Sequence, residues 1–294
     1  MNVKLIDRIA TIAFYFIAFL VVSILLGLIG YIFIHGLPKL NWEFLSSPPE
    51  IFKAGGGVGP QLFNSFYLLV LTMIFSIPLS VGAGIYMAEY AKKNWLTDFL
   101  RTVIEVLSSL PSIVVGLFGF LFFVINMGWG FSILSGALAL TVFNLPLLVR
   151  VVEESLRSIP AAQREAGLAL GISRWEAVTH ILLPAALPGI LTGVILSAGR
   201  IFGEAAALIY TAGMSSPDLD FTNWNPFSST SPFNPMRPAE TLAVHIWKIN
   251  GEGMMPDVQA VSDGAAAFLV LAILVFNLLA RLIGRLVYKK MTAS

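Results

Sequence analysis

The chain has 294 residues, of which 57% are hydrophobic and only 12% are charged, and its mean hydropathy is +0.83. A chain this apolar is atypical of soluble domains, so the composition places it among membrane proteins. The absence of cysteine excludes disulfides and thiolate chemistry, and a net charge of +1 gives no indication of nucleic acid as a partner.

Uncharged apolar stretches along the chain predict six transmembrane helices in an all-α polytopic membrane protein. Ile9–Ile34 carries no charge over 26 residues, which suits a spanning helix and exceeds the core of a signal peptide. Val106–Val149 is uncharged over 44 residues. As one helix it would be about 66 Å long, roughly twice the hydrocarbon thickness, so it must fold back near the turn signal Asn126–Gly130. The predicted spans are residues 9–34, 62–88, 103–126, 131–150, 187–212 and 264–288, with longer loops at 35–61, 151–186 and 213–262.

The distribution of lysine and arginine orients these helices. With both termini in the cytoplasm, the cytoplasmic segments hold 13 of the 18 basic residues and the outer loops hold four. Because cytoplasmic loops carry an excess of basic residues, we expect 151–186 to face the cytoplasm and 35–61 and 213–262 to face outside. The eighteenth basic residue is Arg200, which lies within a predicted span.

The outer segments contain glycines and aromatic residues. The run Gly55–Gly57 is not followed by the Gly-Lys-Ser/Thr of a phosphate-binding loop, so it predicts a flexible turn. Trp224, Phe227 and Phe233 lie among prolines in the second outer loop, where they could anchor an extracytoplasmic partner or form an aromatic belt at the membrane surface.

The most polar stretch inside the chain, Ser158–Gly189, has the pattern of two short helices around a turn. Ser158 is expected to cap the first helix, and Gly171 is expected to close it. Ser173 and Glu176 have the spacing of a capping box at the start of the second. Such a segment between spans could simply rest on lipid headgroups, or its small residues could receive another protein backbone at close range.

A motif in this stretch resembles the EAA loop of ABC-importer permeases. The pattern is E-A-x-x-x-x-G followed by I-x-L-P, formed by Glu165, Ala166, Gly171, Ile181, Leu183 and Pro184. In that family the loop is the cytoplasmic coupling helix that docks into the ATP-binding subunit. The resemblance therefore implies an ATPase-coupling role for Glu165, Ala166 and Gly171, although Gly167 stands where the loop's name would put a second alanine.

A charged pair, Arg200 and Glu204, lies within the fifth predicted span. Four residues apart on a continuous helix, the two side chains would share one face at a depth where unpaired charges are costly. They could form a structural salt bridge. Alternatively, Arg200 could line an anion pathway, because its planar guanidinium binds two oxygens of an oxyanion at once, with Glu204 as gate or proton acceptor. Two G-x-x-x-G pairs on the same helix could pack closely against a neighbour, and they are Gly189 with Gly193 and Gly199 with Gly203.

Three stretches together resemble the PstA-type permeases of phosphate-specific ABC importers. They are the Gly-rich segment before the second span, Leu110–Phe118, and Gly199–Gly213, and the resemblance extends from Gly55 to the basic tail. Around the charged pair the family pattern is A-R-x-x-G-E-T-A-P-L. Arg200, Gly203 and Glu204 match it, whereas Ala205 and Ala207 replace the threonine and the proline.

This resemblance implies a type I ABC importer permease fold in a bacterial or archaeal cell membrane, with inorganic phosphate as the substrate. The implied partners are a PstC-type second permease, two copies of a PstB-type ATPase and a PstS-type extracytoplasmic phosphate-binding protein. No cofactor is expected in this chain, since it lacks the lysine-containing loop that would hold a nucleotide, and ATP and Mg²⁺ would bind to the ATPase. A permease for molybdate, sulfate or phosphonate is an alternative.

A membrane enzyme acting on a phosphorylated lipid is a further alternative, in which Arg200 would bind the headgroup and Glu204 would act as acid or base. Against it, no nucleophile has an evident base, and the three histidines fall in separate loops, so neither a catalytic nor a metal site is expected. Ser108, Ser109 and Ser112 flank Pro111 and could offer hydroxyls to a passing anion, or could satisfy backbone carbonyls freed by the proline.

Overall fold

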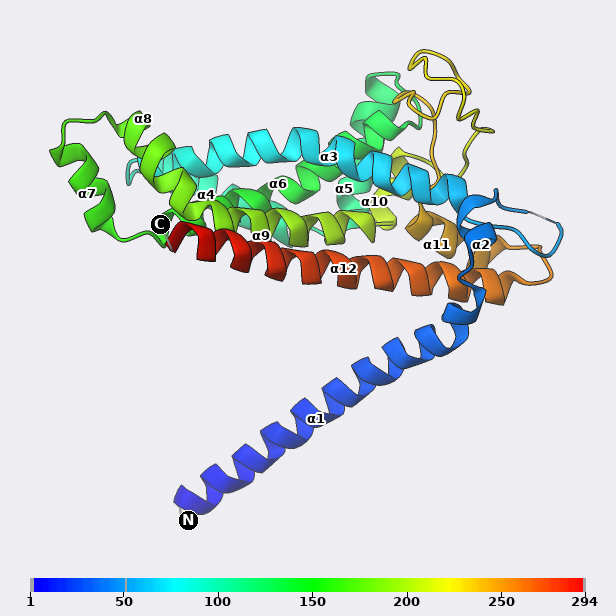
Figure 1. Ribbon diagram of the computed structural model, residues 1–294, viewed down its shortest axis with the longest axis horizontal. Helices are drawn as coiled ribbons and strands as arrows, with labels where there is room; N and C mark the ends of the chain where they lie inside the picture. The colour runs from blue at the N-terminus through cyan, green and yellow to red at the C-terminus, as the bar shows by residue number, and fades with distance from the viewer. Residues whose placement is uncertain (1–2, 51, 293–294) are drawn as a thin grey trace.

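The protein is a bundle of long helices with one helix standing apart (Figure 1). The structure, a computed structural model, describes residues 3–50 and 52–292, and every regular element within these ranges is helical. Five helices are long and apolar enough to cross a membrane, and a sixth span is present if one sharply bent helix pair is counted as a unit. The prediction of an all-helical membrane fold is therefore confirmed.

Four long helices run side by side through the bundle: α3 (Gly59–Ile85), α6 (Ile133–Arg157), α9 (Leu183–Phe202) and α12 (Val258–Thr292) (Figure 1). Glycines allow the backbones to approach closely. A Cβ atom on Gly193 would lie 2.2 Å from a methyl of Val151 on α6, and one on Gly199 would lie 3.7 Å from Phe276 on α12. The G-x-x-x-G pairs of α9 thus serve packing within this chain.

Helix α3 and helix α6 lie parallel, with a constant offset along the sequence. Gly84 faces Val152 and Gly136 faces Leu68, so facing residues differ by 68 positions (152 − 84 and 136 − 68). The same offset places Pro78 of α3 level with Pro146 of α6. Each proline removes one hydrogen bond from its helix, so the backbone ladder is interrupted at one common depth.

Helix α1 (Val3–Gly36) diverges from the bundle, and its apolar side chains are exposed along most of its length (Figure 1). It joins the bundle at its C-terminal end. There a Cβ on Gly36 would lie 2.2 Å from the backbone oxygen of Asp263 on α12, so only glycine fits this crossing.

The third predicted span is not a single straight helix. α4 (Trp95–Ser109) is separated from α5 (Ser112–Gly119) and the π-helix η3 (Phe120–Asn126) by a bend of 102°. The bend lies at Pro111, which cannot donate a backbone hydrogen bond and disfavours helical geometry in Leu110. The prediction of a single helix over residues 103–126 was therefore wrong, because the chain bends between α4 and α5.

The fifth predicted span also ends early. α9 stops at Phe202, and a new short helix, α10 (Ala206–Thr211), begins after a break at Gly203–Ala205. α10 packs against α5 so closely that a Cβ on Gly116 would lie 2.6 Å from the Cα of Ala207. The predicted continuous helix 187–212 was therefore wrong in this respect.

The two ends of the bundle carry shorter elements. At one end lie η2 (Tyr86–Tyr90), α7 (Ala161–Ala169), α8 (Arg174–Ala177) and η4 (Val178–Leu182). At the other lie η1 (Leu37–Lys39), α2 (Trp42–Ser46) and α11 (Leu242–Glu252), a helix within the predicted loop 213–262 (Figure 1). α11 forms there because its buried residues include Leu242, Val244 and Ile249, which face the bundle.

Substituting Gly116 by alanine should destabilise the protein, because the added methyl group would collide with the backbone of α10. Overpacking of this kind costs about 1–3 kcal/mol. We expect a lower midpoint of thermal unfolding for G116A in detergent. Gly82→Ala on α3 is the matched control, since no atom lies within 4 Å of its added Cβ. Equal midpoints for the two variants would contradict the close packing of α5 and α10.

Candidate transport pathway, coupling loop and outer cluster

The polar segment between α6 and α9 forms a compact helical hairpin at one end of the bundle (Figure 1). Gly171 adopts a φ of +85°, a conformation that favours glycine, and it turns the chain between α7 and α8. The predicted capping box of Ser173 and Glu176 is confirmed. Ser158 does not cap α7. Because α6 continues to Arg157, Ser158 ends that helix and donates its hydroxyl to the oxygen of Ser155.

One face of α7 is held to the bundle and another is free. Arg164 makes an ion pair of 2.7 Å with the nearly buried Glu89 of η2. Gly167 is buried, and a Cβ there would lie 2.7 Å from Ile181, which explains why glycine replaces alanine in the motif. The predicted coupling residues Glu165 and Ala166 are exposed.

Large apolar side chains extend this free surface. Leu170 is 85% exposed at the end of α7, and Trp175 is 57% exposed on α8. Exposed apolar groups on a polar segment are typical of a surface that binds another protein. The hairpin therefore presents a carboxylate, small residues and two apolar side chains together.

Arg200 and Glu204 are not paired with each other. Since α9 ends at Phe202, Glu204 lies in the break, and its carboxylate accepts a hydrogen bond of 3.3 Å from the backbone N–H of Ala207 at the start of α10. Arg200 is exposed, and its Cζ lies 4.1 Å from the ring centroid of Phe143 on α6. No ion pair joins the two within the described part of the chain, so of the two hypotheses for this pair the structural salt bridge across one helical turn was wrong.

Buried polar side chains line the contacts between α3, α6 and α9 beside Arg200. One turn before Arg200, the hydroxyl of Ser197 donates to the side chain of Asn144. Thr72, Ser76 and Ser80 occupy successive turns of α3, and each is at most 1% exposed with no partner for its hydroxyl. Polar groups inside a membrane bundle are costly unless they serve packing or function. Sequence reasoning missed this polar seam, although the four-residue spacing of the three α3 hydroxyls was a readable signal.

The serines around Pro111 bond mainly to their own helix. Ser108 donates to the oxygen of Glu105 and Ser109 to that of Val106, each at 2.8 Å. Both hydroxyls thus occupy carbonyls in the last turns of α4. Ser112 starts α5 and is partly exposed.

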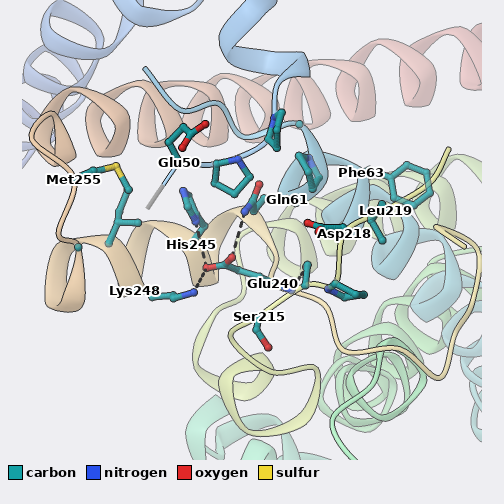
Figure 2. A pocket seen from close by; sticks show the side chains of 18 of the residues that line it. Glu50, Gln61, Phe63, Ser215, Asp218, Leu219, Glu240, His245, Lys248 and Met255 are labelled. Atoms are coloured by element: carbon teal, nitrogen blue, oxygen red, sulfur yellow. Dashed lines mark hydrogen bonds and ion pairs between the residues drawn. The ribbon is translucent and has the colours of Figure 1, made fainter. Parts of the chain in front are cut away.

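At the opposite end of the bundle lies an ionic cluster that sequence reasoning did not identify. Its centre is Glu240, only 4% exposed, which accepts bonds from Gln61 and His245, each at 3.2 Å, and pairs with Lys248 at 3.4 Å (Figure 2). Burial alone would raise the pKa of Glu240. The hydrogen bond from His245 and the charges of His245 and Lys248 together outweigh this effect of burial. The pKa of Glu240 therefore lies below its ordinary value.

Arg237 adds a second buried charge to this end. Its guanidinium donates to the side chain of Asn64 at 2.7 Å and to the oxygen of Pro232 at 2.9 Å, and Asn64 donates in turn to the backbone oxygen of Glu240. Burial lowers the pKa of Arg237 to about 10, so the group stays protonated at neutral pH. We call Gln61, Asn64, Arg237, Glu240, His245 and Lys248 the outer cluster.

Two segments at this end, the glycine run and the loop with the aromatic residues, can be compared with what the sequence predicted. The run at Gly55–Gly57 begins in a turn, as predicted, and hydrogen bonds hold it: the N–H of Gly55 donates to Asp257 and that of Gly57 to the oxygen of Pro48. Trp224 and Phe227 are exposed, whereas Phe233 is partly buried and stacks on Trp224 and against Phe63. Phe233 therefore attaches the loop to α3.

Comparison with known proteins places these features in a family. A family model described as binding-protein-dependent transport system inner membrane component matches residues 80–293. The probable ABC transporter permease protein YqgI of Bacillus subtilis (strain 168) is 56% identical over 294 residues, the full length of both chains. The phosphate transport system permease protein PstA of Yersinia pestis is 35% identical over 256 residues, 85% of this chain and 79% of that protein.

Solved structures are similar in fold. A bacterial alginate ABC transporter in complex with its alginate-bound periplasmic protein matches with a TM-score of 0.64 at 16% identity, over 97% of this chain and 95% of that one. The MetNI methionine ABC transporter in an inward-facing conformation matches with a TM-score of 0.57 at 19% identity, over 76% of this chain and 94% of that one. These likenesses confirm the predicted type I ABC importer permease fold.

Neutralising Glu240 should destabilise the outer end, because E240Q leaves Lys248 without its carboxylate. Because the side chain of Lys248 is 34% exposed, water screens part of its charge, and the cost is smaller than the roughly 3–5 kcal/mol of a fully buried pair. Since the pKa of Glu240 is depressed, its contribution is present above the ordinary pKa of 4.5 and is lost as pH falls below it.

We expect the unfolding midpoint of E240Q in detergent to lie below that of the parent at pH 7, with the gap closing as the pH falls below about 4.5. Glu252→Gln, which changes an exposed carboxylate at the end of α11, should leave the midpoint unchanged. A gap that stays constant over the whole pH range would contradict the role assigned to the Glu240 charge.

Proposed function

Because the chain belongs to the family of binding-protein-dependent transport system inner membrane components, we propose that it is the permease subunit of an ABC importer that carries inorganic phosphate into the cell. Its similarity to phosphate transport system permeases supports phosphate as the substrate. The position of Arg200 supports its role as the residue that contacts the anion. The subunit works with a second permease, two ATP-binding subunits and an extracytoplasmic binding protein. ATP hydrolysis takes place on the ATP-binding subunits.

Arg200 is the proposed anion contact. Its side chain is exposed on α9 and lies over Phe143, which attracts the cation while leaving guanidinium N–H groups free to donate. Within the described residues no carboxylate pairs with it, so an incoming oxyanion displaces no internal partner. Glu204 acts indirectly, because its carboxylate accepts a hydrogen bond that fixes the start of α10.

The α7–α8 hairpin is the proposed coupling element on the cytoplasmic side, where both termini also lie. Glu165 and Ala166 form the contact with the ATP-binding subunit, together with the exposed Leu170 and Trp175. The ion pair of Arg164 with Glu89 then passes displacement of α7 to the end of α3.

Changes at Arg200 test the substrate pathway in the reconstituted complex. R200A should abolish phosphate uptake, and R200K should retain little, because the charge remains but the bidentate contact is lost. E204Q should be milder than E204A, since the amide oxygen of glutamine still accepts from Ala207. Uptake of labelled phosphate, with sulfate and molybdate as competitors, provides the measurement, and co-purification of the partners is the control for assembly.

Two outcomes would contradict this pathway. One is normal uptake by an assembled R200A complex. The other is recovery of uptake in R200A/E204A, which would mean that the two side chains act as a structural pair and that the anion follows another face of the bundle.

Changes in the hairpin test the coupling. G171L places a branched side chain at a φ of +85°, which costs about 1–3 kcal/mol, and E165K reverses the exposed charge. Both should reduce binding of the ATP-binding subunit and uptake while membrane insertion persists. Gln163→Lys is the matched control, because Gln163 is exposed on another face of the same helix. Unchanged ATPase binding and uptake in both variants would exclude the coupling role.

A further inference from the structure

A pocket of about 750 Å³ lies beside the outer cluster, at the end of the bundle away from the α7–α8 hairpin (Figures 1 and 2). Its walls come from residues 45–50, the first turns of α3, residues 215–221, α11 and residues 253–255. This volume is in the range of pockets that bind small molecules. We call it the outer pocket.

The wall of the outer pocket is apolar with an excess of carboxylates. Its apolar lining includes Pro48, Pro49, Phe63, Leu219, Met254 and Met255. The carboxylates are Glu50, Asp218 and Glu252, all exposed, and the buried Glu240. The lining ammonium group, Lys248, is already engaged by Glu240 and by the backbone oxygen of Met214. Three carboxylates are therefore left without an internal cation among the lining residues.

Two nearly buried side chains in the wall each retain an unused polar atom. Gln61 is 1% exposed and His245 is 3% exposed. Gln61 donates its amide N–H to Glu240, which leaves its Oε1 without a partner, and His245 binds Glu240 through Nδ1, which leaves its Nε2 without a partner. The Oε1 atom of Gln61 is an amide oxygen and can only accept, so a ligand that engages it must supply a donor.

We propose that the outer pocket binds a small organic cation, with a primary ammonium or guanidinium group on an apolar body. The cationic group donates to Gln61 and is attracted by the carboxylates of Glu50 and Asp218, which lie on either side of Gln61, and the apolar body packs on Met255 (Figure 2). The carboxylates repel phosphate, so this site differs in charge from the pathway at Arg200. The inference does not rest on the proposed function.

Titration calorimetry of the purified full-length chain in detergent tests this site, with phenethylammonium as the probe and the neutral 2-phenylethanol as its analogue. We expect saturable binding of phenethylammonium and binding of the alcohol at least tenfold weaker. E50Q/D218N should weaken binding of the cation about tenfold without changing that of the alcohol, because it removes two pocket charges. E43Q/E105Q, two exposed carboxylates outside the lining, should leave the affinity unchanged.

Methionine methyl NMR gives the location independently of these variants. Phenethylammonium should shift the methyl signals of Met254 and Met255, which line the pocket, and should not shift that of Met73 in α3. The unfolding midpoint without ligand shows whether E50Q/D218N remains folded. Absence of saturable binding, equal affinity for the neutral alcohol, unchanged affinity in folded E50Q/D218N, or shifts confined to Met73 would each overturn the proposal.

Discussion

The fold depends on one constraint: lipid offers no partner to a backbone N–H or C=O, so every break in a membrane helix needs an internal substitute. At the break after α9, the carboxylate of Glu204 accepts from the backbone N–H of Ala207 in the first turn of α10. At the end of α4, the hydroxyls of Ser108 and Ser109 donate to carbonyls of the preceding turn. Glu204, Ser108 and Ser109, which the sequence suggested as residues of a transport pathway, thus form hydrogen bonds with the backbone at these interruptions. Arg200 is different, because the contact of its guanidinium among the described residues is with the ring of Phe143 and not with a backbone group.

The sequence was sufficient for the class of fold but not for its interruptions. A helix must match the thickness of the bilayer to cross it, so uncharged stretches of that length were enough to indicate an all-helical membrane fold. The bend at Pro111 and the break at Gly203–Ala205 could not be placed, because many prolines and glycines are tolerated inside membrane helices and only tertiary contacts decide which of them break the chain. The alternative of an Arg200–Glu204 salt bridge assumed a helix that continues to Glu204, whereas α9 ends at Phe202.

Local signals in polar segments were more reliable than long-range ones. The capping box of Ser173 and Glu176 forms as its spacing predicted, because the two groups bond to each other's backbone within one turn. The outer cluster could not be predicted, because Gln61 and Glu240 are 179 positions apart and meet only after α3 and α11 pack together. The charges of Arg237 and Lys248 were read as topological markers of an outer loop, whereas folding places Arg237 in the interior and joins Lys248 to a buried carboxylate.

Helix α3 connects the two polar ends of the molecule. Its first turns hold the outer cluster through Gln61 and Asn64, and the π-helix that continues it pairs with α7 through Glu89. Between these ends, three buried hydroxyls lack partners at depths that include the paired prolines of α3 and α6. An interrupted backbone ladder bends at lower cost than an intact one, and a hydroxyl without a fixed partner loses no hydrogen bond when its neighbour moves. If the α7–α8 hairpin couples to an ATP-binding subunit as proposed, a displacement there would cross the middle of α3 at lower cost than it would cross an uninterrupted helix.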